Sequence, residues 1–106
     1  MSKYLYQASY TAEGLKGLLK EGGSKRRAAV EELARSVGAK VEAFYYVLGD
    51  SDVIVIIDAP DNVSAAAASL VINASGAAHL DTTVLLTPEE MDNATKKSVS
   101  YRPPGR

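Results

Sequence analysis

His79 is the only histidine in the chain, so it is the one side chain whose unperturbed pKa lies near neutrality. Asp81 follows two residues later, and on a strand the two side chains would share a face. Such a pair can act as a general base with its orienting partner. We favour the alternative, a histidine on an edge strand beside a carboxylate, because no nucleophile is evident. A metal site that adds a third carboxylate is favoured less, and we predict no metal or cofactor.

A second candidate site lies in residues 22–27, where two glycines lead into a hydroxyl and three cations. If a helix begins here, its free backbone N–H groups and its dipole could bind an anion through Gly23, Ser24, Arg26 and Arg27. The segment is not a P-loop, because it lacks the preceding strand and the Gly-Lys-Ser/Thr order. The alternative is an ordinary capped helix whose cations point to water.

Tyrosines form the third candidate, because five of the six lie in two segments with the composition of strands. Rings on one sheet face could line a pocket for an aromatic ligand, with Tyr6 and Tyr45 as candidate contacts. A tyrosine stripe is more often the core of an interface between subunits, and we favour that interpretation. The five residues are Tyr4, Tyr6, Tyr10, Tyr45 and Tyr46.

The first half of the chain predicts a strand and two helices that would position these groups. Residues 3–10 are rich in β-formers and alternate between two faces. Thr11 is a suitable N-cap for a short helix, which the two glycines interrupt. Ser24 would cap a second helix, whose apolar residues recur at helical spacing until Gly38 ends it.

The middle of the chain predicts a hairpin, with strands at 40–48 and 52–58. The second of these strands is apolar without alternation, which is typical of a central strand covered on both faces. Asp50 and Asp52 in the turn could hold a hard cation. We favour a turn role for them, because a calcium site needs more oxygen ligands than this turn offers.

The last part predicts a helix from Asp61 to about Asn73 and a strand at 78–86. Thr87-Pro88-Glu89-Glu90 is a capping box with proline at the first helical position, so a short helix should begin there. The order is β-α-β-β-α-β plus a C-terminal helix. It predicts an α+β, ferredoxin-like sandwich with a four-stranded antiparallel sheet and helices on one face. We expect one domain over 1–98 and an extended tail over 99–106.

The face of the sheet without helices carries too few polar residues to stay in contact with water. Large exposed apolar patches usually mark interfaces or ligand grooves. We therefore expect a homodimer or a higher oligomer that associates through this open face, and a monomer is the alternative.

Composition excludes several classes of protein. The chain has 106 residues, no cysteine and a net charge of −1. It therefore lacks thiolate chemistry and the basic excess of nucleic-acid binders. No apolar run is long enough to span a membrane, and the strand pattern begins at once, leaving no room for a signal peptide. We expect a cytoplasmic protein that binds neither nucleic acid nor membrane.

The segments Tyr4 to Gly14, Gly22 to Val30, Gly49 to Asp52 and Leu86 to Glu90 resemble the GYD-domain family over nearly the whole chain. The resemblance implies a small, mostly bacterial protein related to the dimeric α/β-barrel group, which associates through the sheet, and it implies no established activity. Ser51 stands where the family's Gly-Tyr-Asp signature has tyrosine, which could alter a pocket that the ring lines in relatives.

Two functions remain open at this point. We favour a non-catalytic oligomeric domain that binds a small anionic or aromatic molecule. The alternative is a cofactor-independent oxygenase or isomerase of the dimeric α/β-barrel type that uses His79 and Asp81. An enzyme needs His79 to face an enclosed cavity with convergent polar groups, whereas a binding domain does not.

Overall fold

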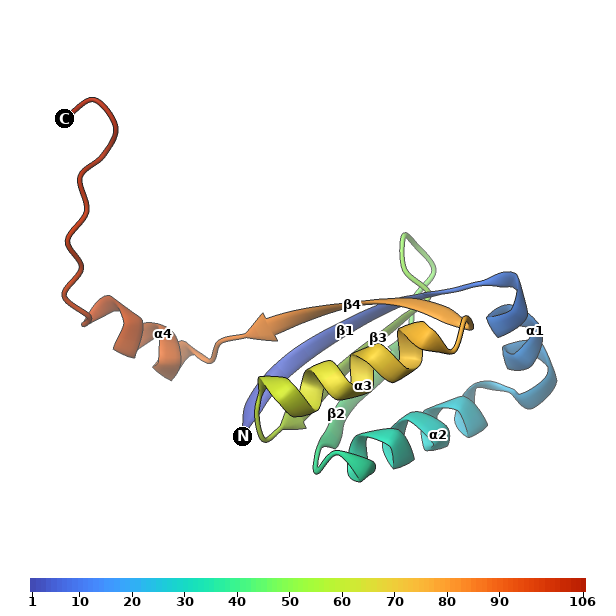
Figure 1. Cartoon of the computed structure of the whole chain (residues 1–106). Helices are drawn as coiled ribbons and strands as arrows, with labels where there is room; N and C mark the ends of the chain where they lie inside the picture. Colours follow the sequence, from blue (N-terminus) through green and yellow to red (C-terminus); the bar gives the residue numbers. More distant parts are fainter.

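The computed structural model describes residues 1–106 as four strands and four helices (Figure 1). The elements are β1 (Ser2–Tyr10), α1 (Ala12–Glu21), α2 (Gly23–Ser36), β2 (Lys40–Tyr46), β3 (Val53–Ala59), α3 (Asn62–Ala74), β4 (Ala78–Leu85) and α4 (Pro88–Thr95).

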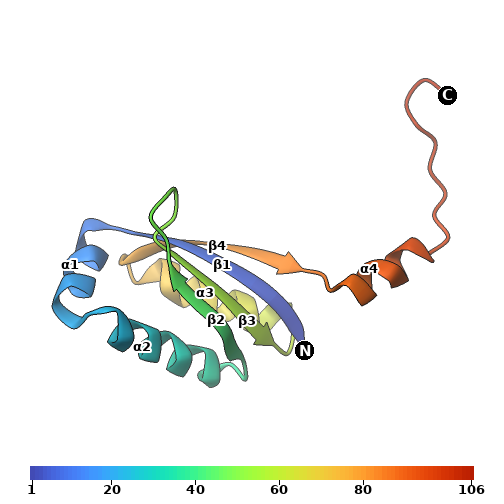
Figure 2. The same ribbon diagram turned by 180° about the vertical axis from the view of Figure 1, so that it is seen from behind.

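The strands form one sheet in the order β2-β3-β1-β4, and every neighbouring pair is antiparallel. Figures 1 and 2 show α2 and α3 on the same face of this sheet, with α1 at one end. The predicted α+β, ferredoxin-like fold with an added C-terminal helix is confirmed. None of the helices combines the length and the apolar character that crossing a bilayer requires.

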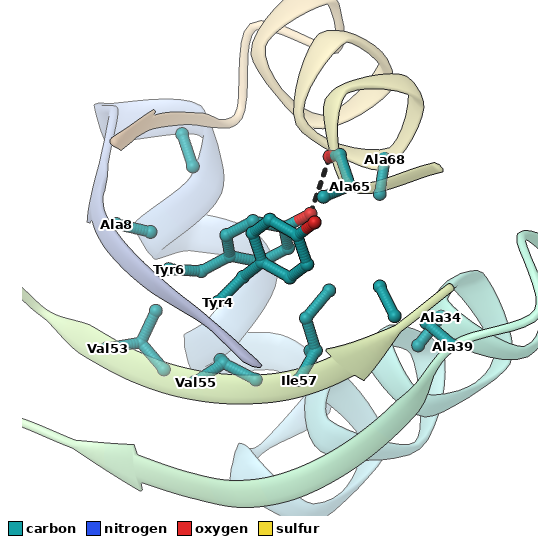
Figure 3. Packing of buried hydrophobic residues seen from close by; sticks show 12 residues of the cluster. Tyr4, Tyr6, Ala8, Ala34, Ala39, Val53, Val55, Ile57, Ala65 and Ala68 are labelled. Atoms are coloured by element: carbon teal, nitrogen blue, oxygen red, sulfur yellow. Dashed lines mark hydrogen bonds between the residues drawn. The ribbon is translucent and has the colours of Figure 1, made fainter. Parts of the chain in front are cut away.

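The core lies between the sheet and the helices. Val53, Val55 and Ile57 on β3 are buried, and so are Ala65 and Ala68 on α3. Because an alanine side chain is one methyl group, α3 can lie close to the sheet. The rings of the buried β1 tyrosines fill the space between them (Figure 3).

Tyr4 and Tyr6 therefore belong to the subunit's own core, and the prediction that places them in an interface between subunits is wrong. The Tyr4 hydroxyl donates to Oδ1 of Asn62 at 2.5 Å, and the Tyr6 hydroxyl donates to the carbonyl of Ala65 at 2.6 Å. The first turns of α3 thus satisfy both hydroxyls, as buried polar groups require. Tyr45, by contrast, is 70% exposed.

The predicted caps are confirmed at three of the four helices. Thr11, Asp61 and Thr87 each accept a hydrogen bond from a backbone N–H in the first turn, and Glu90 completes the capping box. The predicted cap of α2 is wrong, because Ser24 lies inside the helix. Gly22 is the N-cap, with φ of +85° and no side-chain bond. That backbone conformation is open to glycine and costly for other residues.

The second face of the sheet, here called the open face, carries the alternate side chains of the strands. Leu5, Ile54 and Ile56 lie at its centre, where the register pairs Leu5 with Ile56. No helix covers them, yet the sheet itself leaves all three partly buried. The open face therefore has an apolar middle.

A charged group lies at one end of the open face. The Lys3 ammonium pairs with Oε2 of Glu42 at 2.6 Å and with Oδ2 of Asp58 at 3.2 Å. These contacts raise the pKa of Lys3, the hydrogen bond to Glu42 most strongly. The other oxygen of Asp58, Oδ1, is buried without a hydrogen-bond partner.

Residues 87–106, here called the C-terminal arm, project from the rest of the molecule beyond the end of β4 (Figures 1 and 2). The arm contains α4, and residues 96–106 form neither helix nor strand. Every residue from Pro88 to Arg102 is exposed. The tail at 99–106 contains two consecutive prolines, which lack the backbone N–H groups that regular structure would use, and residues 104–105 form a turn.

Candidate functional site

A cavity of about 200 Å³ lies between the sheet and the helices α2 and α3. Its floor is made by residues of the four strands that include Tyr6, Phe44 and Val55. Val30 and Ile72 line its helical walls, from α2 and α3 respectively. Of its sixteen lining residues fourteen are hydrophobic, so the cavity suits the apolar part of a small molecule.

Arg26 is the only charged residue that lines this cavity. It lies in the first turns of α2, and its side chain is one-third exposed. Its Nη1 atom is 3.7 Å from Oε1 of Glu21, a long contact between two partly exposed groups. Exposed ion pairs of this kind contribute little free energy, so the guanidinium can exchange this partner for another anion.

The hydroxyl of Tyr6, which lines the cavity, is neutral at physiological pH. Burial, with a smaller effect of Tyr4, raises the pKa of Tyr6 to about 12. Tyr10 lines the same cavity and lies near Tyr46. Burial and Tyr10 raise the pKa of Tyr46, while the positive charges of Arg26 and Arg27 act in the opposite direction. The hydroxyls of Tyr6 and Tyr46 can therefore take part in hydrogen bonds, and they are poorly suited to act as bases.

A second, more open hollow of about 340 Å³ adjoins the cavity, and Phe44 lines both. Gly23, Ser24 and Arg27 line it from the start of α2, and Tyr45 and Tyr46 line it from β2. The hollow thus gathers polar and aromatic groups at the start of α2.

The glycine at position 23 is required by contact with Tyr46. The Tyr46 hydroxyl donates to the carbonyl of Gly23 at 3.0 Å, and a Cβ atom on Gly23 would lie 2.9 Å from a carbon of the ring. The Tyr46 ring in turn packs edge-on against Phe44, with ring centres 5.3 Å apart. These contacts fix the wall between the cavity and the hollow.

The structure thus divides the six predicted ligand-binding residues between two neighbouring spaces. Tyr6 and Arg26 line the cavity, and the other four line the hollow, namely Gly23, Ser24, Arg27 and Tyr45. The residues that the sequence suggested for an anion site and for an aromatic site therefore line two spaces that share Phe44.

His79 and Asp81 lie elsewhere, on the edge strand β4. The register places them beside Ser9 and Gln7, on the open face and away from the helices. Both are exposed, and neither lines the cavity or the hollow. No further histidine, aspartate or glutamate lies close enough to His79 and Asp81 to form a three-residue group that could hold a metal ion.

Asp52 has a structural contact in the hairpin. Its Oδ2 accepts a hydrogen bond from the backbone N–H of Tyr10 at 2.8 Å, and its own N–H donates to the carbonyl of Ala8. The carboxylate therefore ties the loop between β2 and β3 to the end of β1, which agrees with the predicted turn role.

Most of the cavity wall escaped prediction. Val30 and Leu33 on α2 lie at helical spacing, which is equally typical of residues packed in a core, and Ile72 lies on another helix. The cavity arises because α2 and α3 both contact the sheet but make little contact with each other. No pattern in the sequence reports that separation.

Comparison with known proteins identifies one family. The GYD domain matches residues 4–95. This range includes all four helices and all four strands, apart from the first two residues of β1. No curated protein and no solved structure is detectably similar to the chain.

Proposed function

The chain belongs to the GYD-domain family, and we propose that it is a binding protein for a small acid with an apolar, preferably aromatic, body. The observation that carries this proposal is the apolar cavity with a single cation, Arg26, in its lining. The ligand's body would occupy the cavity, and its carboxylate would meet the guanidinium.

Volume supports a ligand with about one ring. An apolar cavity of about 150 Å³ in another protein stays dry and binds benzene. The cavity beneath α2 and α3, at about 200 Å³, can therefore hold a ring with a small substituent. Larger, drug-sized ligands usually occupy pockets of about 300 to 1,000 Å³.

Charge supports a carboxylate on that ligand. A guanidinium binds a carboxylate through two parallel hydrogen bonds, which are stronger than neutral ones. In the free protein Arg26 has only the long contact with Glu21. A ligand carboxylate would replace Glu21, and the apolar cavity would exclude water from the ring.

The test uses benzoate as the probe, with titration calorimetry and a thermal shift as measurements. We expect benzoate to bind and benzamide to bind at least about tenfold more weakly, because a hydrogen bond to a charged group contributes about 1.5–3 kcal/mol. Arg26→Gln should remove this preference for benzoate. Arg27→Gln is the matched control, because Arg27 lines the hollow instead and should leave the affinity unchanged. Equal affinity of the two variants would contradict the proposal.

The proposal also includes self-association through the open face. Its support is the apolar middle formed by Leu5, Ile54 and Ile56, which no helix covers. Apolar patches of this kind are typical of protein interfaces. The alternative of an enzyme built on His79 and Asp81 has less support, because both side chains lie outside the cavity.

A further inference from the structure

We infer that the C-terminal arm of each chain binds the open face of a second copy. This inference rests on the proposed self-association and names the element that covers the face. Four observations carry it: the exposure of the arm, the length of α4, the shape of the open face, and the distribution of charge.

The arm has no packing partner within its own chain. Met91, Val99 and Tyr101 are 50%, 78% and 74% exposed, although their side chains are apolar or aromatic. Figure 1 shows the arm leaving the molecule beyond the end of β4 instead of turning back over the sheet. Burial of these three side chains therefore needs a surface outside the chain.

The helix α4 also needs such a surface. It has only eight residues, and isolated helices shorter than about 12–15 residues are marginal in water. Yet its start has a full capping box, proline in the first turn and two acidic residues near the positive end of the helix dipole. The sequence favours a helix here, and docking would supply the remaining stability.

The open face offers a matching surface. Leu5, Ile54 and Ile56 form an uncovered strip across the two central strands, where the apolar side chains of the arm can pack. The Lys3 ammonium and the carboxylates of Glu42 and Asp58 lie at one end of the strip, where polar groups of the arm can meet them.

Charge favours the same pairing. Residues 96–106 carry four cations and no acid, namely Lys96, Lys97, Arg102 and Arg106. Residues 1–86, the body without the arm, carry eight basic and ten acidic residues, a net charge of −2, and the arm as a whole carries four cations and three acids, a net charge of +1. The end of the arm is therefore attracted to the body of another copy, and complementary charge also speeds association.

The test is site-directed cross-linking between introduced cysteines, which is specific because the chain has no cysteine of its own. One full-length preparation carries Ser100→Cys in the arm, and the other carries Thr83→Cys, which is exposed on the open face next to Leu5. After mixing and brief treatment with a bismaleimide, we expect a cross-linked heterodimer. The matched control mixes Ser100→Cys with Val63→Cys, which is exposed on the helix-covered side. We expect at least about tenfold less product from the control pair.

The outcomes separate this inference from the proposed self-association. Dimers in sedimentation that give no excess of the Ser100–Thr83 product would overturn the arm inference alone. Monomers at every concentration would overturn both. Cross-linking within one doubly substituted monomer would show that the arm folds onto its own face, which also overturns the inference. A chain that ends at Leu86 should have a dimer dissociation constant raised at least about tenfold.

Discussion

Single residues decide what the cavity can do. Arg26 supplies its only charge, and Tyr6 lies across its floor with its hydroxyl already bonded to the carbonyl of Ala65. The sequence drew attention to both, because a cation near a helix start and a tyrosine on a strand are recognisable patterns. It could not show that Tyr6 faces the helices, since alternation defines two faces without saying which one is covered.

The buried Tyr6 hydroxyl gives a pH dependence whose sign can be derived. In the unfolded chain this hydroxyl ionises near its ordinary pKa of about 10, whereas in the folded chain its pKa is about 12. Between these values the folded state holds more protons, so the free energy of unfolding falls as pH rises from about 10 to about 12. Tyr6→Phe cannot ionise, and we expect its stability to fall less over this interval.

Urea unfolding at several pH values, with both chains measured in parallel, checks this expectation. At neutral pH Tyr6→Phe should be less stable by about 1 kcal/mol, because it loses one buried hydrogen bond. Equal slopes of stability against pH above about pH 10 would contradict the burial of this hydroxyl.

At the scale of elements, local signals predicted the helices and strands well. Thr11, Asp61 and Thr87 cap the helices as expected, because a side-chain oxygen that bonds the first turn acts within a few residues. The start of α2 was misplaced by two residues, because Gly22 caps it through its backbone conformation and Ser24 was the more familiar signal. How far apart α2 and α3 lie depends on contacts between distant residues, which no local pattern records.

Packing between elements predicts an asymmetric result for two glycines of α1. A Cβ atom on Gly14 would lie 2.0 Å from the carbonyl oxygen of Ala77, which is backbone and cannot move aside easily. Gly14→Ala should therefore destabilise the protein by about 1–3 kcal/mol.

Gly17 serves as the control, because a Cβ atom there would lie no closer than 4.0 Å to another group. Gly17→Ala should stabilise the helix by about 0.5–1 kcal/mol. Midpoints of urea unfolding measure both effects, and a neutral Gly14→Ala would show that α1 does not pack against the start of β4 as described.

At the scale of the whole molecule, the sequence predicted the fold and the uncovered sheet face. It did not predict that the C-terminal arm projects from the rest of the molecule. The apolar middle of the open face could be predicted from β3, because five consecutive apolar residues on a strand cannot all face the subunit's core. The position of the arm could not be predicted, because a capping box indicates that a helix begins at Pro88 but does not indicate the direction in which that helix leaves the sheet.

Self-association predicts a contrast between the two sides of the molecule. Ile56→Asp places a charge in the middle of the open face and should shift a micromolar sample toward monomer in sedimentation velocity. Val63→Asp, on the exposed side of α3, should leave the assembly unchanged. Circular dichroism confirms that both variants are folded, and an equal effect of the two substitutions would argue against the open face as the interface.

The separation of α2 from α3 has a consequence for kinetics. Each helix is held chiefly by the sheet, so one can swing outward while the β1 to β4 ladder keeps its hydrogen bonds. Such a local opening requires a fraction of the free energy of global unfolding. A guest molecule would therefore enter and leave the cavity many times during the lifetime of one folded chain.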